Sequence, residues 1–217
     1  MIFGSGAAVR SQDRLSLFCI GDSRCVGNFS TDRGGYRYGF FTRLQTKLGY
    51  DPRLCGSNFW NSFVLPCCAQ SGDRVADCLT KVTAQSPLFL GMNLVLIDIG
   101  VNDAIVGTTP ATIISGVNSI IDQVRTYSPN AIVIVTKTVD YNGFTSLVTA
   151  YNSALGTAMA LRGDYAVNPA IGKTSLYDAN TDIGPYSVTY FANDGHNNAA
   201  GYDIIAAGYY NKIASLL

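Results

Sequence analysis

The sequence contains a single histidine, at position 196, and charged residues make up only 14% of its 217 residues. Acidic and basic residues balance to a formal net charge of zero, so the chain lacks the basic surface that binds phosphates through counterion release. No apolar run reaches the roughly 18 residues that a membrane-spanning helix needs. We therefore expect neither a nucleic-acid partner nor a membrane span.

The first ten residues, MIFGSGAAVR, lack the basic start and the long apolar stretch of a secretory signal peptide. Residues 1–13 are typical of a linker or an extended arm, as in a domain taken from a longer protein. The low charge and the abundance of Gly, Asn, Thr and Tyr favour an extracellular or virion-associated setting. The oligomeric state leaves no signal in the sequence.

The six cysteines form no C-x-x-C pair, and the one histidine is far from them in sequence, so we expect no metal site and no cofactor. Cys19 lies within an apolar run, where a buried, inert thiol is the expected state. Four others are close enough in sequence for one or two disulfides in an oxidising compartment, and their pairing stays open: Cys55, Cys67, Cys68 and Cys78.

Hydrophobic residues make up 47% of the chain, which is enough for the core of one domain spanning residues 1–217. Short apolar runs bounded by turn residues predict strands that are buried on both faces. These runs are 15–20, 63–69, 94–99 and 131–136, with a weaker one at 175–179. Apolar residues at helical spacing predict helices between them: from Tyr36 to Leu48 before Gly49, from Val75 to Val82 behind Ser71 as N-cap, from Pro110 to Tyr127 behind Thr109, over 144–163, and over 202–216.

This alternation of strands and helices predicts the α/β class, in the form of a three-layer α/β/α sandwich around a mostly parallel sheet of about five strands. Pro66 cannot donate a ladder hydrogen bond, which puts the second strand at an edge of the sheet. The flavodoxin-like strand order 2-1-3-4-5 has its second strand at an edge.

Polar, glycine-bearing turns follow the first three strands: GDS at 21–23, SGD at 71–73 and GVND at 100–103. The carboxyl ends of parallel strands meet at one edge of a sheet, where ligands bind, so we expect these turns to converge. A serine hydroxyl needs a base to take its proton, and acyl transfer needs donors aimed at the developing oxyanion. Ser23 as nucleophile and His196 as general base supply the first need. The backbone N–H groups of Ser23 and Gly72 and the side-chain amide of Asn102 supply the second.

This set resembles the SGNH/GDSL hydrolase family of esterases and lipases, whose blocks contribute Ser, Gly, Asn and His in that order. GDS at 21–23, AQSGD at 69–73, GVND at 100–103 and DGHNNAAGY at 194–202 are similar to those blocks. The resemblance implies a serine esterase that hydrolyses short acyl esters through an acyl-enzyme on Ser23. Acetyl groups on carbohydrate are the favoured substrate, and a weak or inactive carbohydrate-binding or virion-surface module is the alternative.

Two positions depart from the family's pattern. Arg24 follows the serine where the family usually has Leu, although some viral haemagglutinin-esterases with this type of site also carry Arg. The family's last block is Asp-x-x-His, whereas Asn193 stands three residues before His196 and Asp194 two before it. The imidazole is therefore oriented by Asp194, which the pattern favours, by Asn193, or by a backbone carbonyl.

Other polar and aromatic residues near these blocks have structural interpretations. We expect Asp22 to bind loop amides, and Asp103 either to support the site residues from behind or to lie at a helix start. Four aromatic residues are candidates for a sugar-binding groove, but packing is the favoured interpretation for them: Tyr36, Tyr38, Phe59 and Trp60.

Overall fold

The computed structural model describes residues 14–30, 34–56, 67–85, 90–193 and 195–217. Its central sheet is six-stranded, and every strand pairing in it is parallel. The strands are β1 (Ser16–Gly21), β2 (Arg53–Cys55), β3 (Cys68–Ala69), β4 (Leu94–Asp98), β5 (Ile132–Lys137) and β6 (Thr174–Asp178). The order is β2-β1-β4-β5-β6, with β3 also paired to β1. This architecture confirms the predicted α/β/α sandwich.

The sheet edge beside β1 is made of two short strands where the sequence predicted one. Arg53 of β2 pairs with Ser16 at the start of β1, and Cys68 of β3 pairs with Ile20 near its end. The predicted strand 63–69 is therefore only partly right, because β3 begins at Cys68, and residues 63–66 lie outside the described part of the chain. A strand as short as β2 shows no periodicity in the sequence, so it was not predicted.

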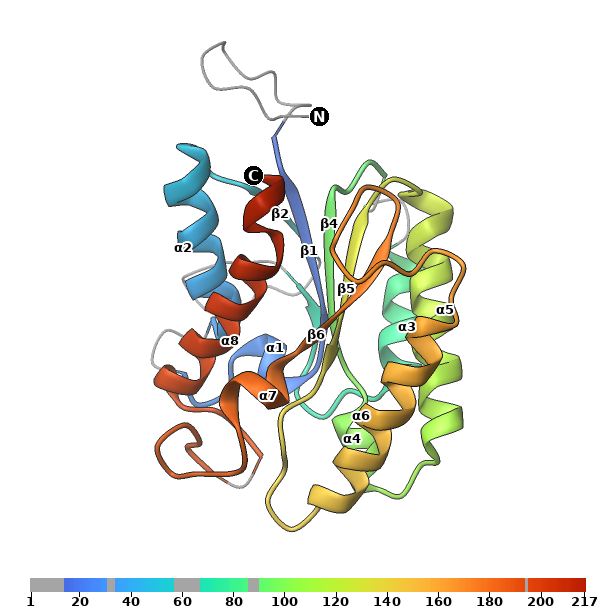
Figure 1. Cartoon of the computed structure of the whole chain (residues 1–217), viewed down its shortest axis with the longest axis vertical. Helices are drawn as coiled ribbons and strands as arrows, with labels where there is room; N and C mark the ends of the chain where they lie inside the picture. Colours follow the sequence, from blue (N-terminus) through green and yellow to red (C-terminus); the bar gives the residue numbers. More distant parts are fainter. Residues whose placement is uncertain (1–13, 31–33, 57–66, 86–89, 194) are drawn as a thin grey trace.

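Two layers of helices cover the sheet, one on each face (Figure 1). The first layer contains α3 (Val75–Ala84), α5 (Pro110–Tyr127) and α6 (Thr145–Ala160), and the second contains α2 (Tyr36–Leu48) and α8 (Ala199–Ile213). Alternate strand residues face opposite layers: Phe18 and Ile20 join the first core, and Leu17 and Cys19 join the second. The strands are thus buried on both faces, as continuous apolar runs predict.

Most helix ends agree with the sequence signals. Thr109 caps α5 by accepting the N–H of Thr112, and Gly49 ends α2 with a left-handed φ of 72°. The predicted N-cap of α3 is wrong: the N-cap residue is Arg74. The first N–H of α3, from Val75, is bound at 2.9 Å by the carboxylate of Asp103, a residue that no local pattern could identify.

Short helices follow three strands directly at the carboxyl edge of the sheet. They are α1 (Ser23–Val26) after β1, α4 (Val101–Ile105) after β4, and α7 (Ala179–Ile183) after β6. Each is too short to show helical spacing in the sequence. Two of them matter for the candidate site, because α1 carries Ser23 and α4 carries Asn102 to the same edge of the sheet. Within the described residues, no helix is long and apolar enough to cross a bilayer.

All six cysteines are described, buried and not disulfide-bonded, so none of the disulfides that the sequence left open among Cys55, Cys67, Cys68 and Cys78 is formed. Although Cys67 and Cys68 are adjacent in sequence, they lie in different core clusters on opposite faces of the sheet. Burial raises the pKa of the Cys19 thiol to about 12, which agrees with the inert role predicted for it.

Candidate active site

Ser23 lies where β1 ends and α1 begins. The turn before it requires glycine at position 21, because a side chain there would come within 2.6 Å of the carbonyl oxygen of Asp98. Asp22 caps α1, since its Oδ1 accepts the N–H of Arg24 at 3.0 Å. The buried Asp22 therefore has the structural role that the sequence suggested.

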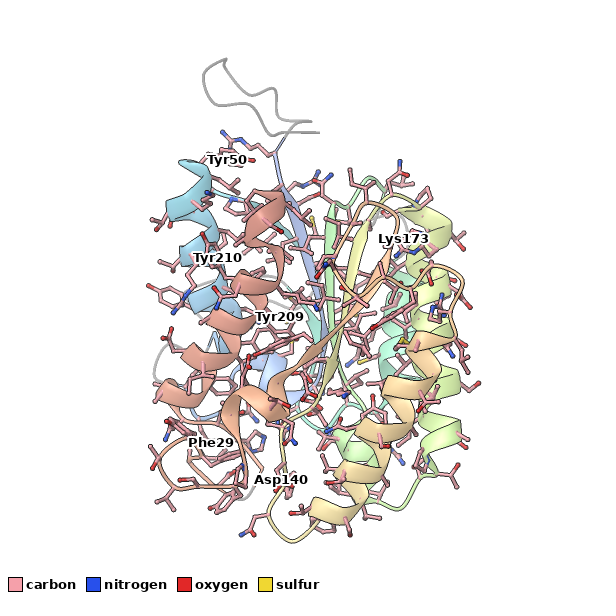
Figure 2. The ribbon with its side chains drawn as sticks, viewed as in Figure 1. Phe29, Tyr50, Asp140, Lys173, Tyr209 and Tyr210 are labelled. Carbon is pink, nitrogen blue, oxygen red and sulfur yellow. The ribbon has the colours of Figure 1, made fainter. Side chains whose placement is uncertain are left out.

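The side chains of Ser23 and His196 are in contact although they are 173 residues apart: Ser23 Oγ lies 2.8 Å from His196 Nε2. Ser23 comes from the carboxyl end of β1, and His196 from the loop just before α8. Figure 2 shows Phe29 and Asp140, from two loops of this region, at the end of the molecule where the strands finish. This geometry suits direct proton transfer from the hydroxyl to the imidazole.

The other imidazole nitrogen of His196 faces Asn193. Its Nδ1 lies 3.1 Å from Asn193 Oδ1, which also accepts the backbone N–H groups of Gly195 at 3.0 Å and His196 at 2.9 Å. The two backbone donors fix the oxygen of the amide toward the ring. Because that oxygen only accepts, Nδ1 carries the proton and Nε2 presents its lone pair to Ser23.

Of the three orienters considered from the sequence, the described residues thus bring Asn193 to the ring. Asp194, the residue that the motif favours, lies outside the described residues. Asn193 Oδ1 accepts the N–H two residues on, the hydrogen bond that defines an Asx turn. The same oxygen therefore shapes the loop and orients the ring.

Burial and the positive charge of Arg24 lower the pKa of His196 to about 4. Asn193 is neutral and does not oppose this shift as a carboxylate would. The imidazole is consequently uncharged, and able to accept a proton, over the whole neutral range. A base with so low a pKa is also a weak one, and the neutral side chain of Asn193 does not raise its pKa as a carboxylate would.

The predicted oxyanion donors lie in turns that are connected to one another. Asn102 Nδ2 donates to the carbonyl of Asp73 at 2.9 Å and lies 3.5 Å from the Asp22 carboxylate. Gly72 has a left-handed φ of 84°, and a Cβ there would meet nothing within 4 Å. Glycine at 72 is therefore required by backbone conformation, and this position borders open space.

Arg24 is a residue whose role the sequence analysis missed. Its side chain is buried and binds two loops: Nε donates to the carbonyl of Gly195 at 2.9 Å, and the two Nη atoms donate to the carbonyls of Val139 at 3.0 Å and Asp140 at 3.1 Å. It also binds the hydroxyl of Thr138. Arg24 thereby connects the helix of Ser23 to the residue before His196. The signal available in the sequence was a charged residue, Arg24, directly after Ser23, where the family usually has Leu.

Arg24 also lies near two buried carboxylates, Asp22 and Asp98. Burial raises the pKa of Asp22 to about 7 and that of Asp98 to about 6, and the guanidinium of Arg24 opposes both rises. The cation thus offsets part of the cost of burying these acids. A neutral side chain at this position would leave them without a counter-charge.

We expect Arg24→Met to lower the free energy of unfolding by about 3–5 kcal/mol, because it leaves buried carbonyls unpaired and removes the counter-charge of two buried acids. Urea denaturation measures this loss. Arg43→Met is the matched control: Arg43 pairs with Asp203 at 2.9 Å on the surface, and such a pair contributes about 1 kcal/mol or less. Equal, small losses in both variants would contradict the anchoring role of Arg24.

The aromatic candidates for a sugar-binding groove separate in the structure. Tyr36 is fully buried in the core, as the packing interpretation predicted, and Tyr38 is 42% exposed on α2. Phe59 and Trp60 lie outside the described residues. An aromatic ring that the sequence analysis did not single out, that of Phe29, packs beside His196.

No group of three potential metal-binding side chains (His, Cys, Asp or Glu) occurs in the part of the chain that the structure describes. The candidate site therefore consists of a Ser–His pair and an amide that orients the imidazole, with the predicted oxyanion donors Gly72 and Asn102 in turns at the same carboxyl edge of the parallel sheet. Such an arrangement defines a class of α/β hydrolytic proteins.

The chain belongs to the GDSL-like lipase/acylhydrolase family, whose family model matches residues 19–204. The match begins in β1 and ends in α8, so it includes Ser23, Gly72, Asn102 and His196. Membership identifies the chain as a hydrolase of esterase type. Sequence comparison with curated proteins gives no significant match.

Solved structures similar to this chain are esterases of the same fold. A family 3 carbohydrate esterase from Clostridium thermocellum superposes with a TM-score of 0.75 at 18% identity, covering 94% of this chain and 96% of that one. A carbohydrate esterase family 3 protein from Talaromyces cellulolyticus gives 0.74 at 18% identity, covering 93% and 97%. The psychrotrophic esterase EstA from Pseudoalteromonas sp. gives 0.68 at 14% identity, covering 93% and 97%.

Proposed function

We propose that the protein is a serine esterase that hydrolyses short-chain acyl esters, with O-acetyl groups on carbohydrate as its substrate class. The observation that carries this proposal is the 2.8 Å contact of Ser23 Oγ with His196 Nε2, together with the acceptor that Asn193 Oδ1 provides at Nδ1. These contacts give the base the tautomer that nucleophilic attack requires.

In the proposed mechanism, Ser23 Oγ attacks the carbonyl carbon of the ester while its proton passes to His196 Nε2. The N–H groups of Ser23 and Gly72 and the amide of Asn102 stabilise the oxyanion. When the tetrahedral intermediate collapses, the bond between carbon and the leaving oxygen breaks, and His196 gives that oxygen its proton. Water, deprotonated by His196, then releases the acid and regenerates Ser23.

Two observations support an ester of a carbohydrate as the substrate. The names of two similar structures, both carbohydrate esterases, suggest the substrate class, although at 18% identity they share only the fold with this chain. In addition, Gly72 borders open space with no side chain of its own, which gives an ester oxygen access to the backbone donors.

The test is labelling by a fluorophosphonate, which phosphonylates an activated serine. We expect one equivalent to bind Ser23, found by peptide mass spectrometry, and 4-nitrophenyl acetate hydrolysis to stop in proportion. Ser23→Ala should not be labelled. Glycan binding without labelling or ester turnover would overturn the proposal in favour of a carbohydrate-binding module.

A further inference from the structure

Phe29 combines two unfavourable features. Among the described residues it is the only one other than glycine with a positive φ, 65°, and its side chain is 59% exposed. A bulky residue with a left-handed backbone is sterically strained, and an exposed phenyl ring forgoes the stabilisation of burial. Strain of this kind persists where the surrounding structure enforces it, and it concentrates at functional sites.

Hydrogen bonds on both sides of Phe29 hold it in this conformation. The carbonyl of Asn28 accepts the hydroxyl of Tyr202 at 2.9 Å, and the side chain of Asn28 donates to Ser71 Oγ at 3.0 Å. Ser30 Oγ donates to the carbonyl of Gly27 at 2.7 Å. The turn is thereby fixed to α1, to α8 and to the turn that contains Gly72.

The ring held in this way packs beside the proposed base. The centroids of the Phe29 and His196 rings are 5.2 Å apart, with 40° between the ring planes. His196 must give its proton to the leaving alcohol, so the alcohol part of an ester passes close to the imidazole. A ring packed against that imidazole therefore lies close to the path of the alcohol.

We propose that Phe29 is a specificity-determining residue that binds the sugar ring of the leaving alcohol. This inference rests on the proposed function. A pyranose presents a face of C–H groups that packs on an exposed aromatic ring, while its hydroxyls need polar partners. A hollow of about 290 Å³ begins at the next residue, Ser30, and its lining residues include Tyr38, Thr42 and the ion-paired Arg43 and Asp203. These side chains are candidate partners for the hydroxyls of the sugar.

The first experiment compares two acetate esters, an O-acetylated methyl glucoside and ethyl acetate. We expect Phe29→Ala to lower kcat/KM for the sugar ester by roughly tenfold more than for ethyl acetate, because only the sugar stacks on the ring. Phe29→Trp should keep the preference for the sugar ester. Equal losses for both esters would overturn the role of Phe29 while the esterase assignment stands. If wild-type protein hydrolysed neither ester, the proposed function itself would fail.

The second experiment measures stability. Phe29→Gly removes both the strained φ and an exposed ring, so we expect its Tm to rise by about 2–4 °C while discrimination between the two esters falls. If Phe29 served only to hold the fold, Phe29→Gly would lower Tm. Leu161→Ala is the matched control, since Leu161 is the C-cap residue of α6 and is 82% exposed, and neither its Tm nor its ester preference should change.

Discussion

Replacing His196 with alanine is expected to lower kcat for 4-nitrophenyl acetate by about 10⁴-fold or more, and Ser23→Ala is expected to do the same. In the proposed mechanism the two groups act in one step, because the hydroxyl that attacks is the one that lies 2.8 Å from His196 Nε2 and gives it its proton. Without the base the hydroxyl is a weak nucleophile, and without the hydroxyl the base has no proton to take.

The double variant distinguishes this mechanism from two independent contributions. Because the pair works as a unit, the Ser23→Ala/His196→Ala protein should be no slower than either single variant. Ser119→Ala is the control for a lost hydroxyl: Ser119 lies on the exposed face of α5 and donates to the carbonyl of Ser115 at 3.0 Å. Wild-type turnover in both single variants, with circular dichroism unchanged, would contradict the assignment of the site.

The parts of the fold that the sequence could predict are those with a regular pattern. Apolar runs marked β1, β4 and β5, and the spacing of apolar residues marked α2, α5 and α6, within a few residues. Ser23, Gly72, Asn102 and His196 could be proposed as a group because each follows a strand or precedes a helix at one edge of the sheet. Parallel strands make that edge common to segments far apart in sequence.

What the sequence could not predict depends on three-dimensional contacts between distant segments. Arg24 binds the carbonyls of residues 139, 140 and 195, which no local pattern links to position 24. The positive φ of Phe29 arises from bonds that Asn28 makes to α8 and to Ser71. The choice between Asn193 and Asp194 depends on the shape of one turn, because a shift of one residue changes which side chain meets the imidazole.

That choice leads to the other large effect. We expect Asn193→Ala to lower kcat/KM by about 10²-fold or more, because Nδ1 loses the acceptor that fixes its proton and the tautomer with a free Nε2 is no longer enforced. Asn193→Asp should instead raise the rate, since a carboxylate at this position stabilises the imidazolium that forms in the transition state. Steady-state kinetics on 4-nitrophenyl acetate measures both changes.

The pH at which kcat/KM falls gives a second test, which does not depend on the absolute rate. With a His196 pKa of about 4, kcat/KM in the wild type should stay constant from neutral pH down to about pH 5 and fall as pH drops through 4, where the base becomes protonated. A carboxylate at 193 favours the charged ring and raises its pKa, so the Asn193→Asp profile should fall at a higher pH. Because the chain has one histidine, ¹⁵N NMR reads its tautomer and pKa without ambiguity.

The matched variant is Asp194→Asn, which tests the residue that the family motif favours. If Asn193 orients the ring, the loss in Asn193→Ala will exceed that in Asp194→Asn, and only exchanges at 193 will move the histidine pKa through Nδ1. The reverse ranking would assign the orienting role to Asp194. The low pKa of His196 would then need another explanation, because a carboxylate bound to Nδ1 raises the pKa of an imidazole. The rate ranking and the pKa must therefore agree, which makes this pair of variants a stringent test of the arrangement around His196.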